Sequence, residues 1–292
     1  MAPLARIPAR TRALALTILA LSLAAAVHAA EPLTVMSFNI RYGTADDGPN
    51  RWTARRQFVA DVLREQAADV AGLQEALDFQ IREVTEANPA YAVVGVGRDD
   101  AKTKGEFSAI LFNKDRLRVA DSGTFWFSDT PEIPASATWG NRITRICTWA
   151  RFIDRDGSAF WVYNLHLDHQ SQPSRERSAE LLLSRIQRRP FADEPVVVTG
   201  DFNAGEDNPA ILGLVRPGGL PGAFVDTFRA LYPDEKRVGT FNGFKGALDG
   251  PKIDYVLVQP GTEVMSAAIV RTSREGRFPS DHFPVIADLI RR

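Results

Sequence analysis

The chain of 292 residues has a single cysteine, Cys147, and this scarcity excludes an intrachain disulfide. The stability of the fold must therefore come from an ordinary hydrophobic core. Basic residues are not in excess either, because 35 lysines and arginines stand against 36 aspartates and glutamates. Proteins that bind nucleic acid irrespective of its sequence usually carry a basic excess. The composition therefore gives no support to binding of that kind.

Long hydrophobic runs are also scarce, because only one occurs, close to the N-terminus. Three arginines between residues 6 and 12 precede the apolar run 13–27, and Ala29 and Ala30 follow it. This pattern is typical of a signal peptide, so we expect cleavage near Ala29 or Ala30 and a secreted or periplasmic protein with no transmembrane segment. A retained membrane anchor is the weaker interpretation, since the run is short and rich in alanine. Without residues 1–30, 32 basic and 36 acidic residues remain.

Residues 31–292 show no low-complexity linker, and they are numerous enough to bury one large core. We therefore expect one domain and a monomer without an obligate protein partner. Hydrophobic periodicity and turn residues predict its elements. The expected strands are 33–40, 69–75, 91–97, 108–113, 117–128, 145–153, 160–167, 196–198, 252–258 and 284–290. Of the three expected helices, the first begins at the N-cap Thr53, the second covers 77–87 and the third begins near Ser174. Long loops are expected over 129–141 and 204–221.

The most informative stretch is the strand 196–198 with the residues that follow it. A run of valines leads into Gly200, Asp201 and Asn203. Side-chain direction repeats every second residue in extended chain, so the carboxylate and the carboxamide point the same way at the end of a buried strand. Taken alone, this stretch is equally compatible with an ordinary exit from a strand into a turn.

Polar residues end three other predicted strands with nearly the same spacing. Asn39 and Glu75 are 36 residues apart, and His166 and Asp201 are 35 residues apart; a predicted helix lies between the members of each pair. This spacing predicts a duplicated strand–helix–strand plan in which two sheets stack face to face, with helices outside. The four strand ends would then meet at one rim.

Six short motifs complete this picture, and their order along the chain is more specific than any one of them. They are Ser37-Phe38-Asn39-Ile40, Leu73-Gln74-Glu75, Asn164-Leu165-His166, Gly200-Asp201-Phe202-Asn203, Lys252-Ile253-Asp254-Tyr255 and Ser280-Asp281-His282. As an ordered set they resemble the endonuclease/exonuclease/phosphatase superfamily, which includes DNase I-type nucleases, abasic-site endonucleases, inositol polyphosphate phosphatases, deadenylases and bacterial sphingomyelinases. The resemblance implies an α/β (α+β) fold, a DNase I-like four-layered α/β/β/α sandwich of two stacked, mainly antiparallel sheets, over residues 31–292.

The resemblance also implies a metal site. Hydrolysis of a phosphate ester by water needs a cation that neutralises phosphoryl oxygens, and hard oxygen ligands suit Mg²⁺ or Mn²⁺. By the resemblance, Glu75 is the main metal ligand, Asn39 lies beside it and Asp281 contributes.

The remaining motif residues are expected to act on the water and the phosphate. By the resemblance, Asp201 is the general base or orients the water, while Asn203 fixes its geometry and touches the phosphate. His282 would contact the phosphate with its tautomer set by Asp254, and His166 would be a second donor to the phosphoryl group. The sequence leaves open whether Asp201 or His282 takes the proton.

Other candidates rest on weaker signals. Arg145 and Arg175 are candidates for substrate binding, although a surface ion pair is the commoner fate of such arginines. Asp168 and His169 are better interpreted as loop residues. Trp52, Trp139 and Phe241 are equally compatible with pocket walls and with packing, and the segment Phe125-Trp126-Phe127 is interpreted as core.

One departure from the abasic-site endonucleases concerns Arg41, because those enzymes carry an acid two residues after the first asparagine. With the expected export and the acidic balance, this argues against DNA repair. The sequence therefore predicts an exported Mg²⁺- or Mn²⁺-dependent phosphoesterase, with a nuclease-type phosphodiesterase preferred. A lipid or inositol-phosphate hydrolase of the sphingomyelinase type and a non-catalytic secreted binding protein are the alternatives, so the partner is a phosphate ester such as nucleic acid or a phospholipid head group.

Overall fold

The computed structural model describes residues 31–215 and 224–291. The expected signal peptide and part of the expected loop 204–221 lie outside these ranges. Within them, no helix is both long enough and apolar enough to cross a membrane.

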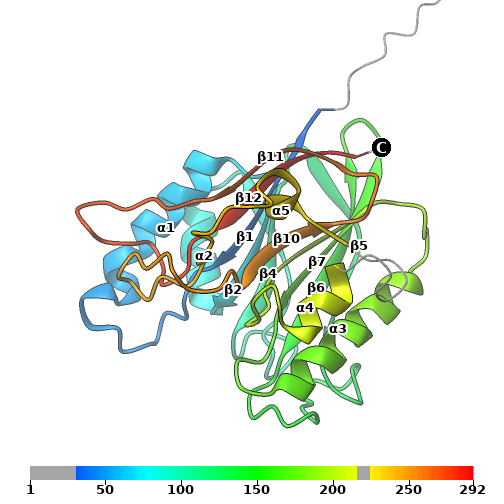
Figure 1. Cartoon of the computed structure of the whole chain (residues 1–292), viewed down its shortest axis with the longest axis horizontal. Coiled ribbons are helices and arrows are strands. Elements are labelled where there is room, and N and C mark those ends of the chain that lie inside the picture. The colour runs from blue at the N-terminus through cyan, green and yellow to red at the C-terminus, as the bar shows by residue number, and fades with distance from the viewer. Residues whose placement is uncertain (1–30, 216–223, 292) are drawn as a thin grey trace, which may run out of the picture. The chain divides into compact units, whose positions relative to one another are not determined.

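The described strands form two six-stranded sheets with the same plan (Figure 1). The first sheet has the order β11-β12-β1-β2-β4-β3, with β1 (Leu33–Asn39), β2 (Val70–Ala76), β3 (Tyr91–Val94), β4 (Phe107–Asn113), β11 (Glu263–Ile269) and β12 (Val285–Ile290). The second has the order β5-β6-β7-β8-β10-β9, with β5 (Leu117–Trp126), β6 (Ile146–Asp154), β7 (Ala159–His166), β8 (Val196–Asp201), β9 (Val225–Asp226) and β10 (Asp254–Val258). The helices are η1 (Gly48–Asn50), α1 (Trp52–Gln66), α2 (Asp78–Ala87), α3 (Gln172–Gln187), α4 (Pro209–Val215) and α5 (Thr227–Leu231).

The two sheets match strand for strand. In each, the third and fourth strands of the order pair in parallel, namely β1 with β2 and β7 with β8, and the other described neighbours pair antiparallel. A parallel pair needs a crossover, which α1 supplies in one half and α3 in the other. The duplicated strand–helix–strand plan expected from the spacing of strand ends is confirmed.

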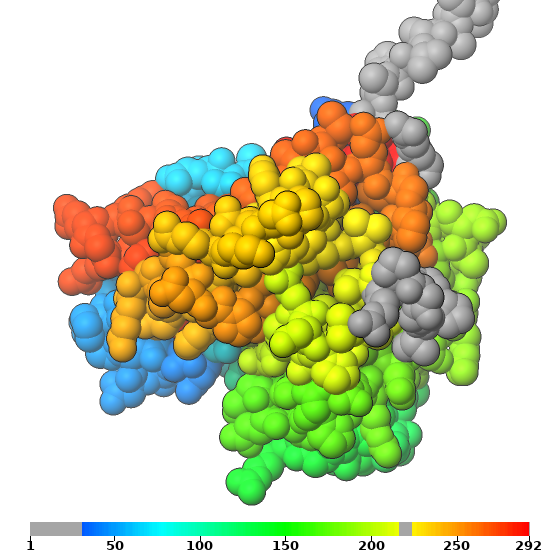
Figure 2. All heavy atoms as spheres, in the orientation of Figure 1, coloured from blue at the N-terminus to red at the C-terminus, as the bar shows by residue number. Residues whose placement is uncertain are grey.

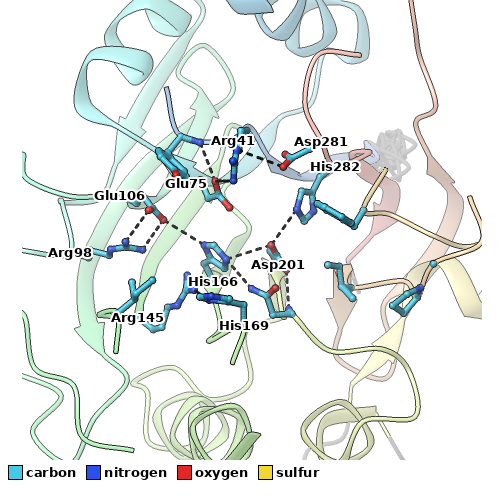
Figure 3. Close-up of a pocket in the computed structure, with 17 residues that line it drawn as sticks. Arg41, Glu75, Arg98, Glu106, Arg145, His166, His169, Asp201, Asp281 and His282 are labelled. Atoms are coloured by element: carbon cyan, nitrogen blue, oxygen red, sulfur yellow. Dashed lines mark hydrogen bonds and ion pairs between the residues drawn. The ribbon is translucent and has the colours of Figure 1, made fainter. Parts of the chain in front are cut away.

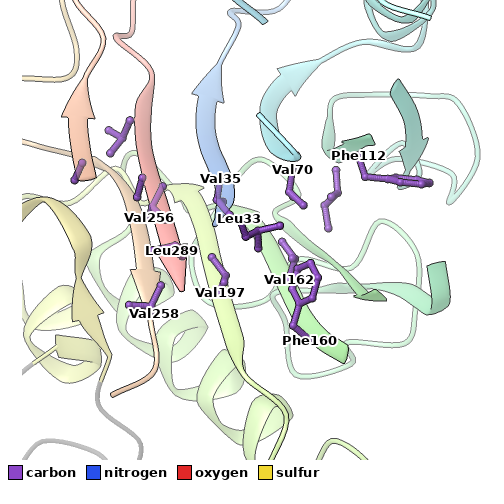
Figure 4. Packing of buried hydrophobic residues seen from close by; sticks show 14 of the residues in the cluster. Leu33, Val35, Val70, Phe112, Phe160, Val162, Val197, Val256, Val258 and Leu289 are labelled. Carbon is purple, nitrogen blue, oxygen red and sulfur yellow. The ribbon is translucent and has the colours of Figure 1, made fainter. Parts of the chain in front are cut away.

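Side-chain alternation along the central strands explains the layers. Val35 of β1 and Val197 of β8 face the other sheet, where Figure 4 shows them in one apolar layer with Val70 and Val162. The neighbouring side chain of Met36 points outward toward α1 and α2. On the far side of the second sheet, α3 and α4 cover an apolar face. Figure 2 shows the two helices next to each other from outside. The fold is the four-layered, mainly antiparallel sandwich that was expected.

Some local predictions were wrong. Arg51, not Thr53, is the N-cap of α1 and makes no side-chain capping bond. The hydroxyl of Ser171, three residues before Ser174, accepts from the Ser174 amide and caps α3. Strand β11 and helix α4 were missed, because β11 is a largely exposed edge strand and α4 is a short helix in a region rich in glycine and proline.

Candidate active site

The polar ends of the central strands meet at one rim of the sandwich. Asn39 ends β1, and His166 and Asp201 end β7 and β8 as partners in the same ladder. Asp254 begins the antiparallel strand β10 opposite Asp201. Glu75 lies in β2 at an irregularity of the β2–β4 ladder, with φ of 61°. Such bulges redirect side chains beside active sites.

Hydrogen bonds join the two halves of this rim. Asn39 Nδ2 donates to Glu75 Oε1 at 3.1 Å and to Asp201 Oδ2 at 2.9 Å, so one amide links both sheets. The chain then turns in the same way in each half. The Arg41 amide donates to Asn39 Oδ1 and the Asn203 amide to Asp201 Oδ1, both at 2.9 Å, and Arg41 and Asn203 adopt left-handed φ of 58° and 48°. Strained residues of this kind persist where hydrogen bonds hold them and cluster at functional sites.

A buried polar layer beneath the rim sets the separation of the sheets. Gln74 Nε2 donates to Asn164 Oδ1 at 2.7 Å, and Asn164 Nδ2 donates to the carbonyls of Leu73 and Ala109 at 2.9 and 2.8 Å. Thr199 Oγ1 donates to the same Asn164 oxygen at 3.0 Å. The residues preceding Glu75, His166 and Asp201 thus lock the two sheets together directly below the site.

His282 lies between two carboxylates. Its Nδ1 is 2.9 Å from Asp254 Oδ2, and its Nε2 is 3.8 Å from Asp201 Oδ2. Burial alone lowers the pKa of His282, but the carboxylates of Asp254 and Asp201 outweigh it and raise the pKa well above its ordinary value. Burial, reinforced by Asp254, raises the pKa of Asp201 to about 7 against the opposing charge of His282. The site therefore presents an imidazolium beside a carboxylate that titrates near neutrality.

His166 differs from His282 in charge and in its hydrogen bonds. Burial, with the charges of Arg145 and Arg98, lowers the pKa of His166 well below its ordinary value. Asn203 Nδ2 donates to the Leu167 carbonyl at 3.0 Å, which fixes the orientation of the amide, and the same nitrogen lies 3.0 Å from His166 Nε2. His166 Nε2 is then an acceptor and its proton is on Nδ1, on the side of Glu106. Donation by His166 to a phosphoryl group stays a prediction, and in this arrangement Nδ1 is the donor.

Two of the three expected metal ligands, Glu75 and Asp281, lie beside one cationic side chain. Arg41 Nη1 is 4.0 Å from Glu75 Oε2, and Arg41 Nε is 3.7 Å from Asp281 Oδ2. Arg41 also donates from Nε and Nη2 to Asp47 at 3.1 and 3.0 Å. The carboxylates of Glu75 and Asp281 are the hard oxygen ligands that Mg²⁺ or Mn²⁺ prefers. The Asn39 amide faces Glu75 with its nitrogen, and its oxygen accepts from the Arg41 amide. Ligand atoms of Glu75, His166 and Asp201 also lie within 4.8 Å of one another. Glu75 belongs to both arrangements.

A cleft of about 500 Å³ opens over these residues. Figure 3 shows Glu75, Arg41, Asp281 and His282 on one side of it and His166 with Asp201 at its centre. Phe241 lies in the cleft wall with its ring edge-on to His282.

Several candidates from the sequence lie elsewhere. Arg175 is outside the lining of this cleft, because its guanidinium donates to the Asp168 carbonyl and to Gln172 Oε1. Trp52 is the buried first residue of α1 and donates to Glu83 of α2, and Trp139 donates to Asp129 outside the cleft. The segment Phe125–Phe127 is buried, as expected.

The second side of the cleft contains residues that sequence reasoning did not select. Arg98 and Glu106 form a two-bonded ion pair there, and His169 lies 2.9 Å from Arg145 Nη2. Asp168 is the loop residue it was expected to be, since it accepts from two backbone amides before α3, but His169 lines the cleft. Arg98 and Glu106 flank a polar loop and belong to no motif, so the sequence carried no signal for them.

Comparison with known proteins identifies the class. Residues 36–282 match the model of the Endonuclease/Exonuclease/phosphatase family, so the chain belongs to this family. The family and its structural neighbours are hydrolytic phosphoesterases, which supports a hydrolase acting on phosphate esters.

Several solved structures are similar to this chain. A family member from Bacteroides vulgatus is 34% identical with a TM-score of 0.82, over 89% of this chain and 99% of that one. A mannosyl-6-phosphatase of Bacteroides thetaiotaomicron is 32% identical with a TM-score of 0.80, over 88% of this chain and 99% of that one. TDP2 of D. rerio, solved with a single-stranded DNA product, is 19% identical with a TM-score of 0.71, over 89% and 99% of the two chains, and shows the fold alone.

Proposed function

We propose that this protein is an exported, divalent-metal-dependent phosphoesterase that hydrolyses a small phosphate monoester. The observation that carries the proposal is the convergence of Glu75, Asp201 and His282 in one cleft of about 500 Å³. A cleft of this size holds a ligand the size of a sugar phosphate or a single nucleotide. Export is supported by the N-terminal sequence pattern alone.

The residues of the site have different roles in the proposed reaction, and these roles follow from their charges. Glu75, with Asn39 and Asp281 beside it, would hold Mg²⁺ or Mn²⁺, which neutralises charge on the phosphoryl oxygens when bound. Asp254 accepts the Nδ1 proton of His282, so Nε2–H of the imidazolium faces the cleft as a donor to a phosphoryl oxygen. Asp201, held by Asn39 and by the Asn203 amide, is placed to orient a water and accept its proton. Because His282 already carries its proton, Asp201 is the better candidate for the base.

A monoester is favoured over the diester that the sequence suggested. The acidic balance of residues 31–292 offers no attraction for a polyanion, and the mannosyl-6-phosphatase is among the similar structures above 30% identity. A lipid hydrolase would need an exposed apolar loop at the membrane surface, and the aromatic segment Phe125–Phe127 is buried and cannot serve as one.

The test is turnover of defined substrates by the purified protein. We expect Mg²⁺- or Mn²⁺-dependent hydrolysis of p-nitrophenyl phosphate that chelation by EDTA abolishes. Asp201→Ala should lower kcat by about 100-fold or more, the usual contribution of a general base. Faster cleavage of bis-p-nitrophenyl phosphate or plasmid DNA would replace the monoesterase with a phosphodiesterase. Absence of metal-dependent turnover on every substrate would instead favour a non-catalytic binding protein.

A further inference from the structure

An ion pair lies in the lining of the cleft, next to His166. Arg98 Nη1 and Nη2 donate to the two carboxylate oxygens of Glu106 at 2.6 and 2.8 Å, and the side chains are 13% and 16% exposed. Glu106 Oε2 is 3.9 Å from Nδ1 of His166. A largely buried ion pair adds little to stability compared with apolar side chains of the same volume. Its place in the cleft wall beside His166 therefore points to a role in binding.

Arg145 extends this wall. Its side chain is 4% exposed, its Nη2 is bonded to His169, and its Nε lies 3.6 Å from Asp168 without a hydrogen bond. Among the hydrogen bonds of residues 31–215 and 224–291, none involves Nη1 of Arg145. A buried guanidinium with unused donors, in the lining of a cleft, has capacity left for an oxygen of a ligand.

The charges of this wall balance. Arg98 and Arg145 are matched by the carboxylates of Glu106 and Asp168 within the same contacts. A second phosphate on the substrate would find no net positive charge here, whereas hydroxyl groups both donate and accept and so suit paired guanidinium and carboxylate groups. The aromatic side chains in the lining of the cleft are those of Tyr42 and Phe241, which lie against Arg41 and His282. Neither ring belongs to the wall formed by Arg98, Glu106 and Arg145, so this wall offers no ring for stacking a nucleobase.

We propose that the wall formed by Arg98, Glu106 and Arg145 is a subsite for the hydroxyl groups of an uncharged, polyhydroxylated leaving group. The substrate is then a sugar phosphate whose phosphate lies over Asp201 and His282 and whose sugar lies against Arg98 and Glu106. This inference rests on the proposed phosphoesterase function and names its substrate class. Arg145 then binds the substrate, as the sequence suggested, and its contact is with the sugar.

The test uses unphosphorylated hexoses as inhibitors, because they occupy the subsite without the reacting phosphate. With the full chain and saturating Mg²⁺, D-mannose or D-glucose should inhibit hydrolysis of p-nitrophenyl phosphate competitively. Glu106→Gln should raise the inhibition constant of the hexose by about tenfold, the loss expected for a hydrogen bond to a charged group. Arg98→Lys, which keeps the charge but loses the planar two-bonded geometry, should raise it as well.

Glu194→Gln is a matched control. Arg151 and Glu194 form the same kind of two-bonded pair, 16% and 18% exposed, away from the cleft, and this variant should keep the wild-type inhibition constant. Equal constants in the Glu106→Gln and Glu194→Gln variants, or no inhibition of the wild type by either hexose, would overturn the subsite. Tighter inhibition by adenosine than by a hexose would do so too. If p-nitrophenyl phosphate is not hydrolysed, the proposed function fails, and calorimetric titration of the hexose into the same variants still decides the subsite.

Discussion

Asp201 occupies the position where the competing charges of the site are most evenly balanced. Burial and Asp254 raise its pKa to about 7, while His282 and the amide of Asn39 oppose this rise. A base acts in its ionised form, and a carboxylate with this pKa is about half ionised at neutral pH. Its burial therefore produces a group that can both accept and release a proton under ordinary conditions.

This balance predicts the pH dependence of the reaction. Below pH 7 the neutral form of Asp201 dominates, so kcat/KM should rise about tenfold per pH unit and level off above about 7. Saturation with Mg²⁺ should move this limb to lower pH, because added positive charge lowers the pKa of a nearby carboxylate. Profiles from pH 5 to 9 at low and high Mg²⁺ measure both effects. A profile that is flat below pH 7, or an unchanged limb in Asp201→Asn, would contradict the assignment.

Arg41 brings a fixed positive charge to the same group of acids. Its guanidinium is 3.7 Å from Asp281 and 4.0 Å from Glu75, and Asp47 holds it there. Hydrogen bonds from Arg55 Nη2 and Gln80 Nε2 to the Arg41 carbonyl, at 2.8 and 3.0 Å, keep its left-handed backbone in place. The guanidinium in this position reduces the net negative charge that is available to bind divalent metal ions.

Replacing Arg41 should therefore change how many metal ions bind. We expect calorimetric titration with Mn²⁺ to give one site in the wild type and a second, weaker site in Arg41→Asp, which adds a carboxylate where a cation was. Arg41→Lys should keep one site. Arg56→Ala, at an exposed arginine that pairs with Glu83 on the surface, is the control and should bind as the wild type does. Two sites in the wild type would refute this view of Arg41.

At the scale of elements, the strand that carries Asp254 depends on a lysine with no exposed surface. Lys252, just before β10, lies 2.6 Å through its Nζ from Asp226 Oδ2 and 3.3 Å from the centre of the Tyr255 ring. Asp226 also accepts from the Phe228 amide at 3.0 Å and so caps α5. One carboxylate thereby joins the start of β10 to a helix and fixes the strand that delivers Asp254.

Removing one member of this pair should cost more than removing both. Lys252→Met leaves the Asp226 carboxylate largely buried without its cation, and we expect a loss of about 3 kcal/mol in the free energy of unfolding. In Lys252→Met/Asp226→Asn the carboxamide still caps α5, so most of that loss should be recovered. Unfolding in urea measures both variants. If Lys252→Met were as stable as the wild type, the ion pair would make no contribution to the free energy of unfolding.

The elements that the sequence predicted correctly have strong periodicity. Strands such as β1 and β8 are runs rich in β-branched and apolar residues, buried along almost their whole length, and this pattern is unambiguous. Edge strand β11 lacks this pattern because most of its side chains are exposed and only its backbone is committed to the sheet. The Arg98–Glu106 pair was missed for a related reason. Nothing in a polar loop indicates which of its charged side chains turn into a cleft.

At the scale of the whole molecule, the site depends on two half-structures meeting at the correct distance. Glu75 comes from one sheet and Asp201 from the other, and the Asn39 amide bonds to both. The nearly equal spacing of polar strand ends predicted this duplication although the halves share little sequence. The spacing could not predict how closely the sheets approach, because that depends on the small and polar side chains between them.

Gly72 tests whether the distance between the sheets controls the chemistry. It lies in β2, and a Cβ at this position would overlap with Thr199 Oγ1 and lie 2.5 Å from Asn164 Oδ1 of the facing sheet. Gly72→Ala should therefore push the sheets apart, lower the free energy of unfolding by about 1–3 kcal/mol and reduce kcat, because Glu75 and Asp201 separate. Gly213→Ala is the matched control, since a Cβ there, in α4, meets no atom within 4 Å and removes only the helix penalty of glycine, about 1 kcal/mol. Urea unfolding and steady-state kinetics on both variants decide the matter: a Gly72→Ala protein with wild-type kcat would mean that the two halves of the site tolerate separation.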